Sequence, residues 1–212
     1  TMPRRNLLTP AERTSLLAFP ATDDEFIQHY TFSESDLSVI RQRRGSHNRL
    51  GFAVQLCYLR YPGFALPTDA EPPASLLKIV GRQLRIEPDI WSQYAQRPET
   101  RREHLLELQA WLKLTPFAVA DYRHFVHQLA ELAQQTDRGI VLAEALVELL
   151  RQQRIILPTV DVIERVCSEA LTRGTRLVYE TLTAPLGDFH RRALDGLLAI
   201  REGTKGSGLI WL

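Results

Sequence analysis

Apolar residues recur along this chain at helical spacing, and prolines, glycines and polar turns separate the helical segments. Three early helix starts carry the capping-box pattern, a Ser or Thr followed three residues later by an acidic residue. The pairs are Thr9 with Glu12, Thr22 with Glu25, and Ser33 with Asp36. The first three-helix unit is predicted over residues 23–31, 34–44 and 47–60, with Gly45 in the tight turn before the third helix. Such a unit suits a helix-turn-helix, although plain helical bundles share the pattern.

A proline-interrupted linker, Phe64–Pro73, follows this unit. Further helices are predicted near residues 74–85, 88–95, 99–113, 116–135, 140–153, 159–173, 175–183 and 186–201. Alternation of apolar and polar residues never extends beyond a few positions, so no strand is expected. The sequence therefore predicts an all-α fold of two helical subdomains with helix-turn-helix-like units. Residues 1–68 would form a DNA-binding subdomain, and residues 69–212 a second one that also binds DNA.

Residues 140–173 form a second helix-turn-helix candidate, because an apolar turn ending in Pro158 and Thr159 joins two predicted helices. The early turns of the second helix would carry base contacts in a DNA reader. Asp161 and Glu164 occupy those turns and would repel phosphates. A helical pair that forms part of the core is the alternative.

The basic residues are segregated, although the whole chain balances 26 basic against 25 acidic residues. Residues 37–68 contain no acidic residue, and we call this segment the basic strip. Its arginines are Arg41, Arg43, Arg44, Arg49 and Arg60, and Gln42, Ser46, His47 and Asn48 lie among them. These side chains can donate to phosphates or base edges, so double-stranded DNA is the first partner hypothesis. A solvated helix face that lacks acids by chance is the alternative.

Two roles are open for the residues at the centre of the strip. Arg41, Arg43 and Arg44 end one predicted helix, where cations also complement the helix dipole. Residues 46–49 form the first turn of the next helix, whose amide groups favour a phosphate. Arg49 is our candidate for reading a guanine, while Arg43 and Arg44 suit backbone positioning. Asn48 could instead cap the turn, and His47 could simply face solvent.

Five further arginines are second-rank candidates for DNA contact. Arg4 and Arg5 suit a basic arm that reaches a minor groove, with a disordered terminus as the alternative. Arg97, Arg101 and Arg102 would form a second phosphate patch, although neighbouring Glu99 and Glu103 partly cancel their charge. These acidic neighbours make the patch weaker than the basic strip.

Motifs for catalysis, nucleotide binding and metal binding are missing from this sequence. It contains no GxxxxGKS, GxGxxG or GxSxG pattern. His124 and His127 could share a helix face, but no third ligand lies near them, so surface histidines are favoured over a metal site. We therefore predict no catalytic residue, no metal and no cofactor in this chain.

Composition indicates an ordinary globular protein, with 44% hydrophobic and 24% charged residues. Cys57 and Cys167 fit neither a disulfide framework nor a metal cluster. This cysteine usage predicts that the protein resides in a reducing cytoplasm. No apolar run is long enough to cross a bilayer, so no membrane partner is expected. Thr1 before Met2, together with the apolar stretch at residues 208–212, suggests the N-terminal piece of a longer protein.

A specific resemblance begins at Asn48 and runs to Gly63, in the string NRLGFAVQLCYLRYPG. This string resembles the N-terminal region of transposases of the Tn-three family of replicative transposons. The opening residues 4–9 and the segment 153–158, QRIILP, are similar to that family as well. The resemblance covers the whole chain.

The resemblance implies a large transposase whose N-terminal third binds the terminal inverted repeats of its transposon. Cleavage and strand transfer would belong to a C-terminal DDE-type domain with a ribonuclease-H-like fold, so this chain would not be an enzyme by itself. Expected partners are DNA at the transposon ends, the remainder of the transposase, and a second copy in the full-length protein. The expected location is the bacterial cytoplasm, with the nucleoid. The rival hypothesis is a helical module that binds a protein or a ligand and has no DNA affinity.

Overall fold

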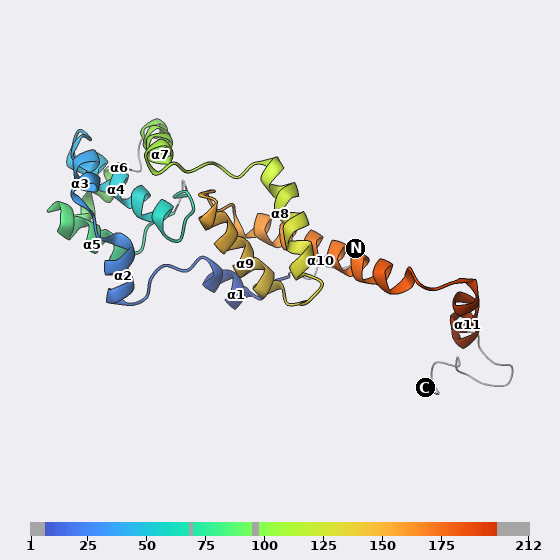
Figure 1. The fold of residues 1–212 in the computed structure, drawn as a ribbon. Coiled ribbons are helices and arrows are strands. Elements are labelled where there is room, and N and C mark those ends of the chain that lie inside the picture. Colours follow the sequence, from blue (N-terminus) through green and yellow to red (C-terminus); the bar gives the residue numbers. More distant parts are fainter. Residues whose placement is uncertain (1–6, 68–69, 95–97, 199–212) are drawn as a thin grey trace.

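The computed structural model describes residues 7–67, 70–94 and 98–198 (Figure 1). The helices are α1 (Pro10–Leu16), α2 (Asp23–Tyr30), α3 (Glu34–Arg41), α4 (Ser46–Arg60), α5 (Ala74–Leu84), α6 (Trp91–Tyr94), α7 (Pro98–Leu112), α8 (Val119–Leu132), α9 (Gly139–Gln152), α10 (Val160–Thr183) and α11 (Asp188–Leu198), with the 3-10 turn η1 (Pro88–Ile90) before α6. Within those ranges no strand forms, and an isolated bridge pairs Thr115 with Ile155. The predicted all-α fold is confirmed.

All three capping boxes form as predicted. At α1 the Thr9 hydroxyl accepts a hydrogen bond from the Glu12 amide at 3.3 Å, and the Glu12 carboxylate accepts one from the Thr9 amide at 2.7 Å. The same reciprocal pair begins α2 and α3. Each box satisfies amide groups that the helix itself leaves without acceptors, which typically stabilises a helix start by about 1 kcal/mol. Local sequence therefore fixes where the first helices begin.

Two predicted helix boundaries are wrong. The helix predicted to run to residue 44 ends at Arg41, because residues 42–45 form the turn before α4. The break predicted near Arg173 is absent, and α10 continues to Thr183. Gly174 packs against α8 so closely that a Cβ there would lie 2.9 Å from the Ala130 carbonyl oxygen. This glycine permits close helix packing and does not end the helix.

The first hydrophobic core surrounds α4. Every residue from Leu50 to Leu59 is buried, because α2, α3, α5, α6 and α7 all pack around this helix. Contributions from these neighbours include Ile40, Leu76, Val80 and Leu108. Cys57 lies here as a free thiol, and burial raises its pKa. A helix that is buried on all faces is a central helix, and the neighbouring helices pack their apolar faces against it.

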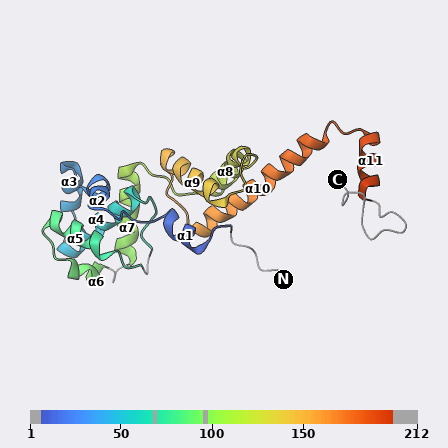
Figure 2. The ribbon, with the colours of Figure 1, turned by 90° about the horizontal axis from the view of Figure 1, so that it is seen from below.

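The second hydrophobic core lies between α8, α9 and α10. It contains Phe125, Leu146 and the free thiol of Cys167, whose pKa burial raises to about 12. Leu8, just before α1, belongs to this core as well. Beyond it, α10 extends away from the body of the molecule and leads to α11 (Figure 2).

Hydrogen bonds and side-chain packing join the two cores near residues 62–64. The Arg151 guanidinium donates two hydrogen bonds to the Pro62 carbonyl oxygen, at 2.8 and 3.0 Å. The Leu157 amide donates to the Gly63 carbonyl oxygen at 2.9 Å. Phe64 packs against both cores. The segment 153–158 that contributed to the family resemblance therefore lies at the junction.

The buried clusters do not follow the predicted boundary at residue 68. Leu76 and Leu108, from the C-terminal side of that boundary, complete the first core, while Leu8 joins the second. Helical periodicity shows which face of α5 is apolar, but it does not show that this face packs on α4. The division into 1–68 and 69–212 stays a prediction.

A chain of buried polar groups lies inside the first core. The Gln55 side-chain amide donates to the Tyr94 hydroxyl at 2.5 Å and to the Arg101 carbonyl oxygen at 3.1 Å. The Tyr94 hydroxyl is 3.0 Å from His104 Nδ1, and the two rings stack. Burial, helped by the charge of Arg43, lowers the pKa of His104 to about 4 from its usual 6.5. The folded state therefore holds this imidazole neutral.

The free energy of unfolding should fall as the pH drops from about 7 towards 4. Below pH 6.5 the His104 ring becomes protonated in the unfolded chain, whereas in the folded chain it stays neutral until the pH reaches about 4. This difference removes on the order of 2–3 kcal/mol near pH 4. The test is urea unfolding of wild type and His104→Asn at several pH values, since the variant has no titrating ring at this position. A smaller loss in the variant is expected, while exposed His127→Asn should lose as much as wild type. Equal losses in wild type and His104→Asn would contradict this origin.

Candidate nucleic-acid interface

A four-residue turn, residues 42–45, connects α3 to α4 and exposes the centre of the basic strip. Gly45 has φ +81°, a conformation that disfavours residues with a side chain. A Cβ at Gly45 would also lie 2.9 Å from the His47 ring. The turn therefore depends on glycine, and the His47 ring, half-buried, lies against it rather than facing solvent freely.

The N-terminus of α4 is open. Its N-cap is Gly45, which has no side chain to accept from the first amide groups, and no acidic residue lies in the first turn. Those amides concentrate partial positive charge at the start of a helix. Ser46 and Arg44 are exposed beside them. This contrasts with α1, α2 and α3, where a carboxylate closes each helix start.

The Arg43 side chain contacts other residues of the protein. Its guanidinium pairs with Glu107 of α7 at 2.5 Å and lies over the Phe52 ring, 4.9 Å from the ring centroid. The side chain is 17% exposed, and its Nε is buried without a hydrogen-bond acceptor. This geometry ties the α3–α4 turn to α7. Arg43 therefore has a structural contact that accounts for its charge, which sequence reasoning had assigned to phosphate positioning.

The side chains of Arg49 and Asn48 both donate hydrogen bonds to backbone carbonyl oxygens of the α3–α4 turn. The Arg49 Nε donates to the Arg43 carbonyl oxygen at 3.0 Å. The Asn48 amide donates to the Arg44 carbonyl oxygen at 2.9 Å, so Asn48 stabilises the turn, as one alternative held. Both side chains are half-buried. The bond from Nε orients the Arg49 guanidinium and leaves its two terminal nitrogens without an acceptor among the described residues.

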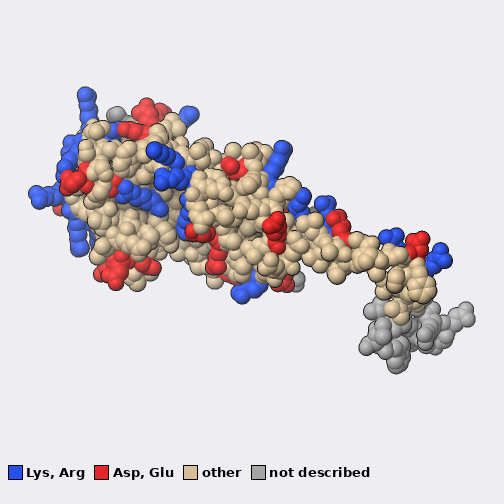
Figure 3. Space-filling model, in the orientation of Figure 1, with Lys and Arg blue, Asp and Glu red and all other residues tan. Residues whose placement is uncertain are grey.

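A hollow of about 630 Å³ lies where α3, α4 and the end of α5 meet, and we call it the basic hollow. Arg41, Arg49 and Arg85 line it together with Gln83, and no acidic residue contributes to its lining. A neighbouring hollow of about 420 Å³ shares Arg85 and adds Lys78 and Arg82, with Glu87 as its acidic member. Figure 3 shows Lys and Arg side chains projecting from the end of the molecule where α3, α4 and α5 lie.

Sequence reasoning missed the basic residues of α5. Lys78 and Arg82 have i, i+4 spacing, and Arg85 follows one turn later, so they lie on one side of that helix. This spacing was a visible signal. Its meaning depended on α5 packing against α2 and α4, long-range contacts that local pattern does not reveal.

The remaining arginine candidates fall into three groups. Arg101 is buried and donates to the Pro67 carbonyl oxygen at 2.7 Å, so its guanidinium serves the fold. Arg102 is exposed on α7. Arg4, Arg5 and Arg97 lie outside the described residues.

The fifth arginine of the basic strip, Arg60, pairs with buried Asp36 at 2.5 Å. Burial raises the pKa of Asp36, but the bonds from Arg60 and Ser33 outweigh it and hold that pKa below its usual value.

The second helix-turn-helix candidate uses its early turns for packing. Arg13 of α1 pairs with both Asp161 and Glu164 of α10. The Glu164 carboxylate also accepts a hydrogen bond from the Leu8 amide at 3.0 Å. Ile163 and Val166 on the same turns are buried. These contacts agree with the core-forming alternative for α9 and α10.

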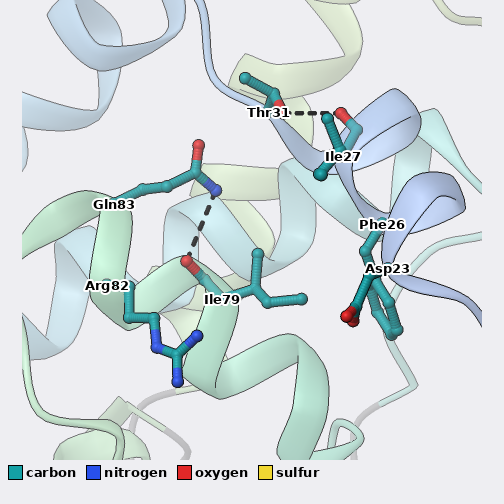
Figure 4. Close-up of a pocket in the computed structure, with 7 residues that line it drawn as sticks. All are labelled: Asp23, Phe26, Ile27, Thr31, Ile79, Arg82 and Gln83. Carbon is teal, nitrogen blue, oxygen red and sulfur yellow. Dashed lines mark hydrogen bonds between the residues drawn. The ribbon is translucent and has the colours of Figure 1, made fainter.

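A mixed hollow of about 430 Å³ lies between α2 and α5, separate from the α3–α4 turn. Phe26 and Ile27 of α2 line one side, and Ile79 and Arg82 of α5 line the other (Figure 4). Ile27 is 64% exposed there. This hollow is the part of the surface that best suits the rival hypothesis of ligand or protein binding.

Within the described ranges, no group of three or more His, Cys, Asp and Glu side chains comes together in a way that would hold a metal ion. None of the described helices combines the length and apolar character that crossing a bilayer requires.

Comparison with known proteins shows which family this chain belongs to. Residues 7–170 match the family described as a domain of unknown function, DUF4158, and the chain belongs to that family. The resemblance to Tn-three family transposases is confirmed by curated relatives along the whole chain.

Three of these relatives span a wide range of identity. The chain is 56% identical over 211 residues to the transposase for transposon Tn3926 of Escherichia coli, and 53% identical over 211 residues to that for Tn501 of Pseudomonas aeruginosa. It is 32% identical over 212 residues to the transposase for Tn1546 of Enterococcus faecium. These matches cover 98–100% of this chain and 21% of each relative. The chain therefore corresponds to about a fifth of a transposase.

Proposed function

We propose that this chain is a DNA-binding region of a transposase and recognises the terminal inverted repeats of its transposon. The observation that carries the proposal is the open N-terminus of α4 beside exposed Arg41 and Arg44, in a strip without acidic residues. Similarity to transposases, which act on transposon DNA, supports the same ligand. A helix start without a capping carboxylate leaves its amides available to a phosphate.

Phosphate contact and base reading fall to different side chains in this proposal. Arg41, Arg44 and Ser46 contact phosphates and fix the register of the protein on the duplex. Arg49 reads a guanine, because its Nε bond to the Arg43 carbonyl holds the guanidinium in one orientation. His47 and Asn48 shape the turn next to Ser46 and Arg49 and add polar contacts to the same duplex. Arg43 supports the turn from within.

Cleavage and strand transfer belong, in this proposal, to a DDE-type domain in the rest of the transposase. The remainder of the transposase, and a second copy of it, are then the protein partners. The location that follows is with the DNA of a bacterial cell.

The chain should bind a duplex carrying the terminal repeat of Tn3926, whose transposase is 56% identical, more tightly than a scrambled duplex. Fluorescence anisotropy at 50 and 200 mM salt measures both affinities. Binding to each duplex should weaken as salt rises, since displaced counterions drive phosphate contacts. A preference for the repeat of about tenfold or more at both salt concentrations is expected. The absence of measurable affinity for either duplex at 50 mM salt would overturn the proposed function.

The mixed hollow between α2 and α5 supports a second candidate, a helical module that binds a protein or ligand. That candidate predicts no duplex affinity, so the same titration separates the two. The polar members of the hollow, Asp23, Arg82 and Gln83, interrupt its apolar lining and make it the weaker candidate.

A further inference from the structure

The end of α5 has an unusual backbone conformation at a basic residue. Arg85 is the C-cap of α5 and adopts the left-handed conformation, with φ 56° and ψ 49°. The Ile86 amide closes the helix end by donating to the Gly81 carbonyl oxygen at 2.9 Å. Glycine is the usual residue at such a position, because a Cβ is disfavoured there. This helix end therefore holds a strained arginine where glycine would relieve the strain.

The Arg85 side chain is exposed and has no hydrogen-bond or ion-pair partner among the described residues. Two other arginines around the first core do have such partners: Arg43 pairs with Glu107, and Arg60 pairs with Asp36. Arg85 instead lines the basic hollow with Arg41 and Arg49, where no carboxylate balances the three guanidinium groups. Like charges that converge without a counter-ion repel each other, and an anion in the hollow would relieve that repulsion.

Gln83 fixes the position of this helix end against the chain that leaves α2 and leads to α3. Its side-chain amide donates to the Tyr30 carbonyl oxygen at 2.9 Å, and its side-chain oxygen accepts from the Phe32 amide at 2.9 Å. The two bonds clamp α5 to the segment between α2 and α3. Arg85 follows Gln83 by two residues, so these bonds hold in place the helix end that carries it.

We propose that the basic hollow binds a phosphate of the DNA backbone and that Arg85 is a phosphate-contacting residue from α5. This inference rests on the proposed function and extends the interface beyond the basic strip. Arg41 comes from the end of α3, Arg49 from the first turn of α4 and Arg85 from the end of α5, so three elements supply the cations that line the hollow. The duplex backbone then runs from the N-terminus of α4 across the end of α5, towards Arg82 and Lys78.

The Arg85→Gly variant tests this role without damaging the fold. Glycine removes the cation and also relieves the left-handed strain, so the variant should melt at the same or a higher temperature than wild type. The slope of log affinity against log salt should decrease by about one unit. Affinity at 150 mM salt should drop about fivefold for the Tn3926 repeat and the scrambled duplex alike, because a phosphate contact is independent of sequence.

Lys113→Gly is the matched control. Lys113 also adopts the left-handed conformation, with φ 55°, after the end of α7. It is exposed and lines neither the basic hollow nor the neighbouring hollow that contains Glu87. This variant loses the same charge and the same strain, and its salt slope should equal that of wild type. Equal decreases in both variants would mean a general charge effect and would overturn the phosphate site.

The outcomes separate this inference from the proposed function. Wild-type binding with the expected salt dependence, together with an unchanged slope in Arg85→Gly, would overturn the phosphate site and leave DNA binding intact. Failure of wild type to bind either duplex would overturn both.

Discussion

Alanine at Gly51 is expected to destabilise the fold by about 2–3 kcal/mol, the upper part of the strain typical when atoms are inserted into a close-packed core. A Cβ at this position would lie 2.2 Å from Cγ of the Tyr94 ring, far inside van der Waals contact. Tyr94 is 1% exposed, and its hydroxyl is held by Gln55 and His104. The ring cannot withdraw without breaking that buried network. The strain and the lost hydrogen bonds therefore act together.

Gly196→Ala is the control for helix propensity. Gly196 lies within α11, and nothing surrounds the position of its missing Cβ within 4 Å. Alanine in an exposed helix is favoured over glycine by up to about 1 kcal/mol, so this variant should be at least as stable as wild type. Chemical unfolding of the three proteins measures the difference. A Gly51→Ala protein as stable as wild type would show that α4 and α6 are not packed as described.

Gly51 also gives a physical reason for the string that carried the family resemblance. A glycine inside a helix is unfavourable by itself, and helical periodicity gives no reason for one in residues 48–63. The structure supplies the reason, since α4 is buried on every face and the Tyr94 ring lies on its backbone. The same holds for Gln55, a polar residue in an apolar helix that bonds to Tyr94 and to the Arg101 carbonyl.

Local signals predicted helix starts well because a capping box depends on residues only three positions apart. The Thr9, Thr22 and Ser33 boxes all form. Helix ends were less predictable where packing overrode propensity, as at Gly174, which α10 uses to approach α8. The all-α fold could therefore be predicted from sequence, whereas the grouping of helices into cores could not.

The candidate interface was partly predictable for the same reason. The basic strip is contiguous in sequence, and its α3–α4 turn is exposed as expected. The partner of Arg43 lies 64 residues away at Glu107, and Arg85 joins Arg41 and Arg49 from another helix, so neither long-range contact could be predicted from local pattern. Charge pattern indicates where arginines gather, but only the fold separates those with internal partners from those left open.

Three arginines of the strip are therefore expected to give three different results in DNA binding. Arg44 is exposed, and its side chain has no partner among the described residues. Arg44→Ala should lower the salt slope by about one unit for the Tn3926 repeat and the scrambled duplex alike, with unchanged stability. Arg43→Ala should leave the slope unchanged and reduce the free energy of unfolding by about 1–2 kcal/mol. That loss combines the Glu107 ion pair with the contact to the Phe52 ring.

Arg49→Lys isolates base reading from charge. Lysine keeps the positive charge, but it cannot form the planar, two-pronged contact that arginine makes with guanine. The variant should lose about 1–3 kcal/mol of affinity for the repeat, equivalent to a roughly 5- to 150-fold larger dissociation constant, and nothing for the scrambled duplex. Its salt slope should match wild type.

Anisotropy titrations of the three variants against both duplexes, with unfolding measured in parallel, distinguish these roles. Equal losses for both duplexes in Arg49→Lys would make Arg49 a phosphate contact of the basic hollow, and the base reader would lie elsewhere. A slope reduced in Arg43→Ala but not in Arg44→Ala would reverse the assignment made here, because the Glu107 pair would then have to open when DNA binds. Such opening would free Glu107 next to the duplex, where its charge would repel the backbone. For that reason the closed pair, with Arg44 as the outer contact, is the arrangement that electrostatics favours.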